Sequence, residues 1–122
     1  MKRAVEPSKR INRLLRELAD RAYDEALGRE LSKLEESFRA WRAGKLTAFD
    51  LTQEIHRFHQ GPNRELYIHY TSRLHELVVA RAVVQGLLSE PSLPEEIRVH
   101  LAPEIARERE ALRQVNDSES AV

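Results

Sequence analysis

Residues 11–41, INRLLRELADRAYDEALGRELSKLEESFRAW, decide the fold class. Apolar residues recur here at steps of three and four, which is the spacing of an amphipathic helix. They form two sets: Ile11, Leu14, Leu15, Leu18, Ala22 and Tyr23, then Leu27, Leu31, Leu34, Phe38 and Trp41. The second set alternates steps of four and three, which is typical of a helix packed lengthwise against another. Gly28 joins the sets without a proline or turn cluster, so we expect one long helix ending near Ala43, before Gly44.

The composition of the whole chain also favours helices. Its 122 residues are 41% hydrophobic and 33% charged, with only 4 Gly and 5 Pro, so charged helix faces are expected to surround one core. No repeat and no alternating strand pattern is present. The sequence predicts an all-α fold, a compact helical domain of about four helices over residues 8–115. A flexible basic arm at 1–7 and a disordered tail at 116–122 flank it.

Three further helices are expected after the first. Thr47 is a good N-cap for a helix that runs to about Gln60, and Gly61-Pro62 then forms a tight corner. With Asn63 as its cap, a third helix is predicted over residues 64–89, and a last one begins near Pro94. Pro103 either kinks that last helix or starts a separate one.

The stretch Leu77–Leu88 (LVVARAVVQGLL) gives the argument for self-association. It is apolar nearly all round the helix, and a chain of this size has little surface with which to cover it, so part of it is expected in a homodimer interface. With Arg81 and Gln85 inside it, the stretch is also far short of the roughly 20 apolar residues that span a bilayer. No membrane association is therefore expected.

Charge and cysteine content limit the possible partners and the location. Acidic and basic residues number 20 each, so no overall field attracts nucleic acid or an anionic membrane. The chain has no cysteine, which excludes disulfides and thiolate metal sites. The basic N-terminus leads into no apolar segment of signal-peptide type, so a cytoplasmic location is expected. No cofactor is implied.

Residues 50–70, DLTQEIHRFHQGPNRELYIHY, contain the best local site candidate. If the Gly-Pro corner folds its two helices against each other, His56, His59, Glu65 and His69 converge as ligands that suit zinc, nickel or iron. The alternative interpretation is structural. In it, His59 lies at the edge of an apolar face and His56 stacks on Phe49.

The same stretch contains an Arg followed by a His, Arg64 and His69, near the start of a helix. This arrangement is similar to the short motif of HEPN-type ribonuclease domains, which are helical, dimeric and metal-independent. The resemblance implies that Arg64 binds the scissile phosphate and that His69 acts as general acid or base. The family usually carries Asn, Asp or His directly after the Arg, whereas this chain has Glu65, whose carboxylate would repel phosphate.

We therefore expect a small interaction or regulatory protein that self-associates through its helices and has a possible protein partner. The alternatives are a dimeric endoribonuclease that cleaves RNA with Arg64 and His69, and a helical metal-binding protein with His56, His59, Glu65 and His69 as ligands.

Overall fold

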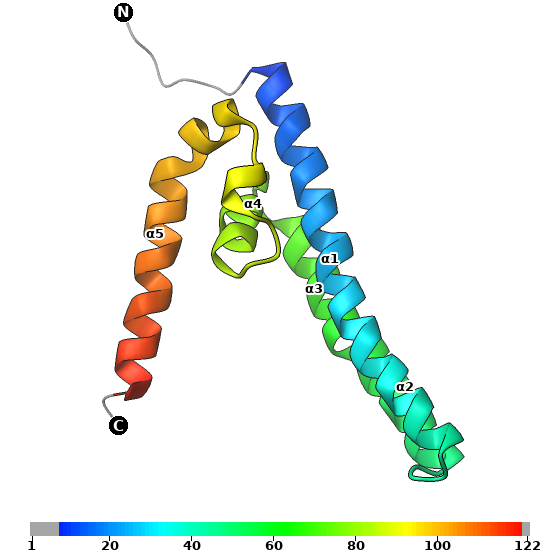
Figure 1. The fold of residues 1–122 in the computed structure, drawn as a ribbon. Coiled ribbons are helices and arrows are strands. Elements are labelled where there is room, and N and C mark those ends of the chain that lie inside the picture. Colours follow the sequence, from blue (N-terminus) through cyan, green and yellow to red (C-terminus); the bar gives the residue numbers. More distant parts are fainter. Residues whose placement is uncertain (1–7, 121–122) are drawn as a thin grey trace, which may run out of the picture. The chain divides into compact units, whose positions relative to one another are not determined.

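The computed structural model describes residues 8–120, which form helices joined by short connections (Figure 1). The α-helices are α1 (Lys9–Arg42), α2 (Ala48–Gln60), α3 (Pro62–Ser72), α4 (His75–Val84) and α5 (Glu95–Ser120), with a short 3₁₀ helix η1 at Glu90–Ser92. No strand occurs in this range, which confirms the all-α prediction. None of these helices is long and apolar enough to cross a membrane. The arm expected at residues 1–7 lies outside the described residues.

The first helix is one long element, as predicted, and local hydrogen bonds define both of its ends. At the start, the Oγ of Ser8 accepts a hydrogen bond of 3.1 Å from the backbone N–H of Ile11. At the end, Gly44 has a positive φ of 77°, and the N–H of Lys45 donates to the carbonyl of Ala40 at 2.8 Å. This is a Schellman termination, which requires the left-handed conformation that glycine adopts without steric cost.

Contacts between residues divide the chain into two compact units, and α1 contributes to both. We call residues 8–22 together with 73–120 the core unit, because fourteen of the seventeen buried apolar residues belong to it. Residues 23–72 form the hairpin unit, in which the second part of α1 runs beside α2 and α3 (Figure 1).

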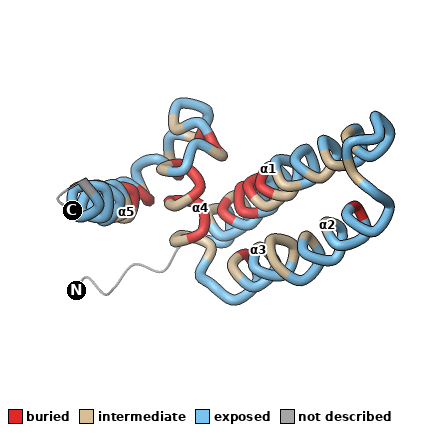
Figure 2. The backbone as a smooth tube through the Cα atoms, turned by 90° about the horizontal axis from the view of Figure 1, so that it is seen from below, coloured by how far each residue is buried: buried red, intermediate tan, exposed pale blue. Residues whose placement is uncertain are grey.

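The core unit is built from the first part of α1 with α4 and α5, and Figure 2 shows the buried residues gathered along these segments. Leu15, Ile97 and Leu101 have no exposed surface. Ion pairs join the elements at the rim of this core: Arg10 to Glu96 at 2.8 Å, and the half-buried Arg81 to Glu108 at 3.1 Å.

The prediction of a single third helix over residues 64–89 is wrong, because the helix is interrupted between α3 and α4. At the end of α3, the hydroxyls of Thr71 and Ser72 donate to the carbonyls of Tyr67 and Ile68, four residues back. Such side-chain bonds compete with the backbone hydrogen bonds that would continue a helix. Leu74 then adopts an extended conformation with 75% of its surface exposed.

Because of this break, the apolar stretch Leu77–Leu88 is buried in a different way from that expected. Val78, Val79 and Ala80 have no exposed surface, and Ala82, Val83 and Leu88 are also buried. Because α4 has only ten residues and packs against α5, a single chain covers it on all sides. The subunit interface that the sequence placed at this stretch is therefore not needed to bury it.

The last helix is continuous. Pro103 lies inside α5 at an exposed position, so the alternative of a separate final helix starting at Pro103 is not found. α5 also includes residues 116–120, which the sequence assigned to a disordered tail.

Candidate functional site

The Gly61-Pro62 corner joins α2 and α3 but does not fold them against each other. The N–H of Gly61 donates to the carbonyl of Arg57 at 2.8 Å, and the N–H of Glu65 donates to the carbonyl of Gly61 at 2.9 Å, so helical hydrogen bonding continues across the joint. α3 follows α2 along the same side of α1 (Figures 1 and 2). Proline is tolerated here because it occupies the first position of α3, where its missing N–H is not needed. Asn63 lies inside α3 rather than capping it.

This geometry does not assemble the metal site suggested by the sequence. That hypothesis required the corner to bring His56, His59, Glu65 and His69 onto one ion. Within residues 8–120, no group of three or more His, Asp or Glu side chains has an arrangement that could hold a metal. His59 instead lies 3.5 Å from the side-chain nitrogen of Asn63, and His69 makes an edge-to-face contact with Tyr70, with ring centroids 4.7 Å apart.

The structural alternative for His56 is also not observed. Phe49 is 83% exposed, and the described ring contacts include none between it and His56. Both side chains lie on the outside of α2.

The two residues of the ribonuclease motif point to different sides of α3. Arg64 and His69 are five positions apart, which separates them by roughly 140° around a helix. Arg64 lines a cavity, and His69 is not among the residues that line it. A catalytic role for this pair within one chain therefore has no geometric support, and its role in RNA cleavage stays a prediction.

The cavity beside the corner brings together side chains from three helices. Its lining residues are Tyr23 of α1, His59 and Gln60 of α2, and Asn63, Arg64 and Tyr67 of α3. Its volume is about 340 Å³. The Tyr23 ring stacks on that of Tyr70, with centroids 4.9 Å apart and planes inclined by 5°. Burial raises the pKa of the Tyr70 phenol above its usual value.

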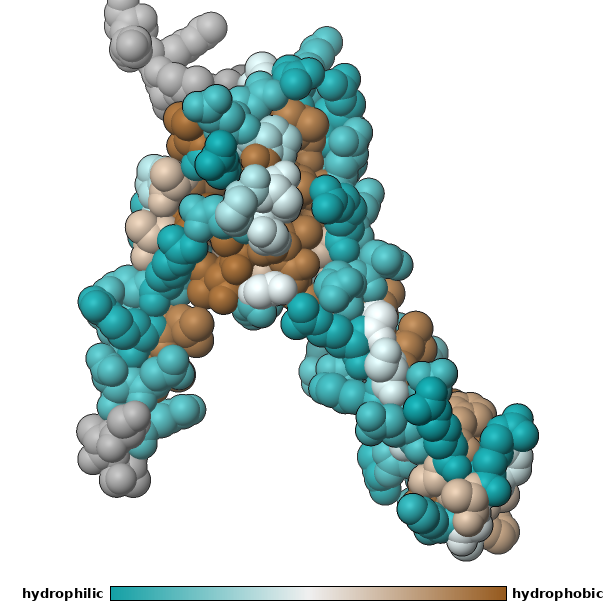
Figure 3. Space-filling view, viewed as in Figure 1, coloured by the Kyte–Doolittle hydropathy of each residue, from teal (hydrophilic) through white to brown (hydrophobic). Residues whose placement is uncertain are grey.

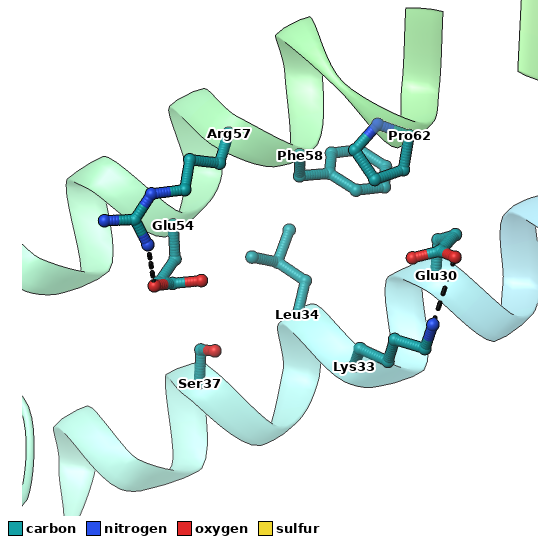
Figure 4. A pocket seen from close by; sticks show the side chains of 8 residues that line it. All are labelled: Glu30, Lys33, Leu34, Ser37, Glu54, Arg57, Phe58 and Pro62. Atoms are coloured by element: carbon teal, nitrogen blue, oxygen red, sulfur yellow. Dashed lines mark hydrogen bonds and ion pairs between the residues drawn. The ribbon is translucent and has the colours of Figure 1, made fainter. Parts of the chain in front are cut away.

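A second cavity of about 190 Å³ lies farther along the hairpin unit, between α1 and α2. Leu34 points across it toward Phe58 and Pro62 (Figure 4). Its charged side chains are already paired with each other. Lys33 lies 3.1 Å from Glu30, and Arg57 pairs with Glu54. Because these charges are paired within the protein, they give no indication of a bound ligand.

Exposed apolar side chains are the third feature of the hairpin unit. Only three of its apolar residues are buried: Ala26, Leu51 and Tyr70. Seven large ones are exposed: Leu31, Phe38, Trp41, Phe49, Ile55, Tyr67 and Ile68. Figure 3 shows hydrophobic atoms at the surface near the α1–α2 end of this unit, among hydrophilic ones.

The sequence pointed to His59 and Arg64 but missed Tyr23, Asn63, Gln60 and Tyr67. A signal existed for the last two, because Gln60, Arg64 and Tyr67 are spaced by four and three residues and share a face if the helix continues through Gly61-Pro62. Tyr23 comes from a distant part of the chain, and no local pattern could have identified it.

Comparisons with protein-family models, with curated proteins and with solved structures found no match for this chain. What can be said of its function therefore rests on the geometry of the hairpin unit.

Proposed function

We propose that this protein is a small cytoplasmic interaction protein that acts as a homodimer, in which the hairpin units of two copies pack against each other. The observation that carries the proposal is the imbalance within residues 23–72, where seven large apolar side chains are exposed and three apolar residues are buried. Three of the seven, Leu31, Phe38 and Trp41, lie on one face of α1, and contiguous exposed apolar surface is typical of a binding site.

The exposed residues of α1 belong to a regular stripe. We call Leu27, Leu31, Leu34, Phe38 and Trp41 the apolar seam. Steps of four and three place all five on one face of the helix. The α2–α3 segment covers this face only in part, because Leu31 remains 51% exposed and Phe38 and Trp41 remain 36% exposed. A seam of this kind is normally covered by a neighbouring helix, so room is left for a partner helix.

The charges of the hairpin unit favour a second copy as that partner. Residues 23–72 contain eight acidic and seven basic side chains. Ion pairs within the unit join Glu25 to Arg29, Glu30 to Lys33, Glu35 to Arg39 and Glu54 to Arg57. A surface whose charges are nearly balanced, with eight of its fifteen charged side chains in these four ion pairs, does not select a strongly acidic or basic partner. A second copy presents the same apolar seam, and two helical hairpins packed together form a four-helix bundle.

The energy at stake is large enough to measure. Full burial of a Leu or Phe side chain is worth about 1.5–3 kcal/mol, and a half-exposed side chain has roughly half of this to gain. Because a symmetric dimer counts each residue twice, removing Leu31 and Phe38 should weaken association by about 3 kcal/mol or more, which is over about a hundredfold in Kd.

The test is the solution mass, measured by light scattering on a sizing column over a series of protein concentrations. We expect the unmodified chain to have twice the 14.2 kDa mass of one copy, and the double variant Leu31→Glu/Phe38→Glu to have the mass of one copy. Ser32→Glu/Ala43→Glu is the matched control, since it adds the same charge at exposed positions outside the seam. A monomeric unmodified chain, or a control that dissociates as the seam variant does, would refute the homodimer.

A further inference from the structure

We infer that the cavity lined by Tyr23, His59, Gln60, Asn63, Arg64 and Tyr67 binds a small organic anion with a planar ring, and that Arg64 holds the anionic group while the tyrosines contact the ring. This inference goes beyond the proposed dimer and does not depend on it. The cavity volume of about 340 Å³ lies within the range of about 300–1,000 Å³ that is usual for small-molecule sites.

The charge of the lining favours an anion. None of its six residues is Asp or Glu, and Arg64 supplies a guanidinium group. Among residues 8–120, the structure gives the Arg64 guanidinium no ion pair or hydrogen bond. The second cavity of the same unit is different, because its Lys33 and Arg57 are paired with carboxylates. An unpaired guanidinium in a concave site is suited to bind a carboxylate or phosphate through two parallel hydrogen bonds.

The aromatic side chains favour a planar ring beside that anionic group. Tyr67 is 59% exposed although it lines the cavity, so much of its ring is free for contact. Tyr23 is held in place because it stacks on Tyr70 with the planes 5° apart. Aromatic rings and guanidinium groups both stack on planar ligands.

Polar groups in the remaining lining can orient such a ligand. Gln60 and Asn63 each offer an amide donor and an amide acceptor, and His59 offers one or two ring nitrogens. The contact of 3.5 Å between Asn63 and His59 is at the upper limit for a hydrogen bond, so these groups lose little when a ligand replaces it.

Two ligand chemistries satisfy this description, a nucleoside monophosphate and an aromatic carboxylate, and isothermal titration calorimetry can distinguish them. The probes are adenosine monophosphate with adenosine as its neutral counterpart, and benzoate with benzamide as its neutral counterpart. We expect at least one anion to bind about 10-fold to 100-fold more tightly than its neutral counterpart, as a charge-assisted hydrogen-bonded pair predicts. Which anion does so identifies phosphate or carboxylate as the recognised group.

Two variants assign the effect to the cavity. Arg64→Gln should abolish the preference for the anion, whereas Arg113→Gln, which removes an exposed arginine paired with Glu110 in α5, should leave it unchanged. Tyr67→Leu should weaken both members of the preferred pair by about 5-fold or more. The seam variant Leu31→Glu/Phe38→Glu should still bind, which separates this inference from the dimer. If both anions bind more weakly than about 1 mM, or if neither binds more tightly than its neutral counterpart, the inference is overturned.

Discussion

The two glycines in the helical segments of the hairpin unit should respond to the same substitution in opposite directions. A Cβ atom built on Gly61 would lie 2.9 Å from the backbone carbonyl oxygen of Arg57, closer than such atoms approach in proteins. A Cβ on Gly28, inside α1, would meet no atom within 4 Å. Neither residue has a positive φ, although Gly61 departs from helical geometry with φ −100° and ψ −100°, and the expected contrast rests on the space around the added Cβ atom.

The expected magnitudes follow from this contrast. Gly28→Ala should raise the free energy of unfolding by about 0.5–1 kcal/mol, because alanine loses less backbone freedom in a helix. Gly61→Ala gains a similar entropic benefit, but it must displace the carbonyl of Arg57 at a cost of about 1–3 kcal/mol. The net effect is a loss of about 1 kcal/mol, so the two variants should differ by about 2 kcal/mol.

The measurement is urea denaturation followed by the fluorescence of Trp41, which is the single tryptophan of the chain and lies in the same unit as both glycines. All proteins are compared at one concentration, because association shifts the apparent stability. The midpoint should move up for Gly28→Ala and down for Gly61→Ala, with little change in slope. Stabilisation by Gly61→Ala equal to that by Gly28→Ala would show that the joint has room for a side chain and would refute the reasoning.

Two further predictions concern the same unit. Burial raises the pKa of the Tyr70 phenol above its usual 10.0, so as the pH rises this phenol ionises in the unfolded chain before it does in the folded one. The stability that Tyr70 contributes is therefore complete below pH 10.0 and is lost as the pH rises through the folded pKa. Thermal melts between about pH 8 and about pH 11 should show this loss of stability. The variant Tyr70→Phe should lack the part of the loss that comes from Tyr70. A pH profile identical to that of the unmodified chain would contradict the assignment. Thr47→Ala should lower the free energy of unfolding by about 1 kcal/mol, because Thr47 Oγ accepts a hydrogen bond of 3.1 Å from the N–H of Asp50 in a capping box. Thr47→Ser should retain most of that stability in the same urea assay, and equal losses from both substitutions would exclude the cap as the cause.

Local signals in the sequence were reliable where the structure depends on local chemistry. The long first helix, its stop at Gly44 and the cap at Thr47 were all predicted, because each depends on side chains within a few residues of the helix end. The break before α4 was missed although Thr71 and Ser72 were visible. Both residues also occur inside helices, and nothing nearby shows whether their hydroxyls will bond to the backbone.

The candidate site was predicted less well, because a metal site was inferred from the residue types before the path of the backbone through them was known. The three clustered histidines suggested a metal, and the prediction depended on Gly61-Pro62 acting as a corner. The joint instead continues the helix, which places Gln60, Arg64 and Tyr67 along one cavity and leaves His69 outside it. Periodicity alone could have indicated this face, but the contribution of Tyr23 depends on tertiary packing.

The way the hairpin unit is stabilised is consistent with an open binding surface. Only three of its apolar residues are buried. Helix ends and helix surfaces are instead stabilised locally, by a capping box at Thr47, a Schellman turn at Gly44 and four ion pairs between residues three or four apart. Such pairs contribute about 0.2–0.5 kcal/mol each, and a cap about 1 kcal/mol. These local devices stabilise the helices while part of the apolar seam of α1 remains exposed, and that part is available to a partner. Mutations in the seam should therefore reduce association more than they reduce helix content, whereas mutations of the caps should do the reverse.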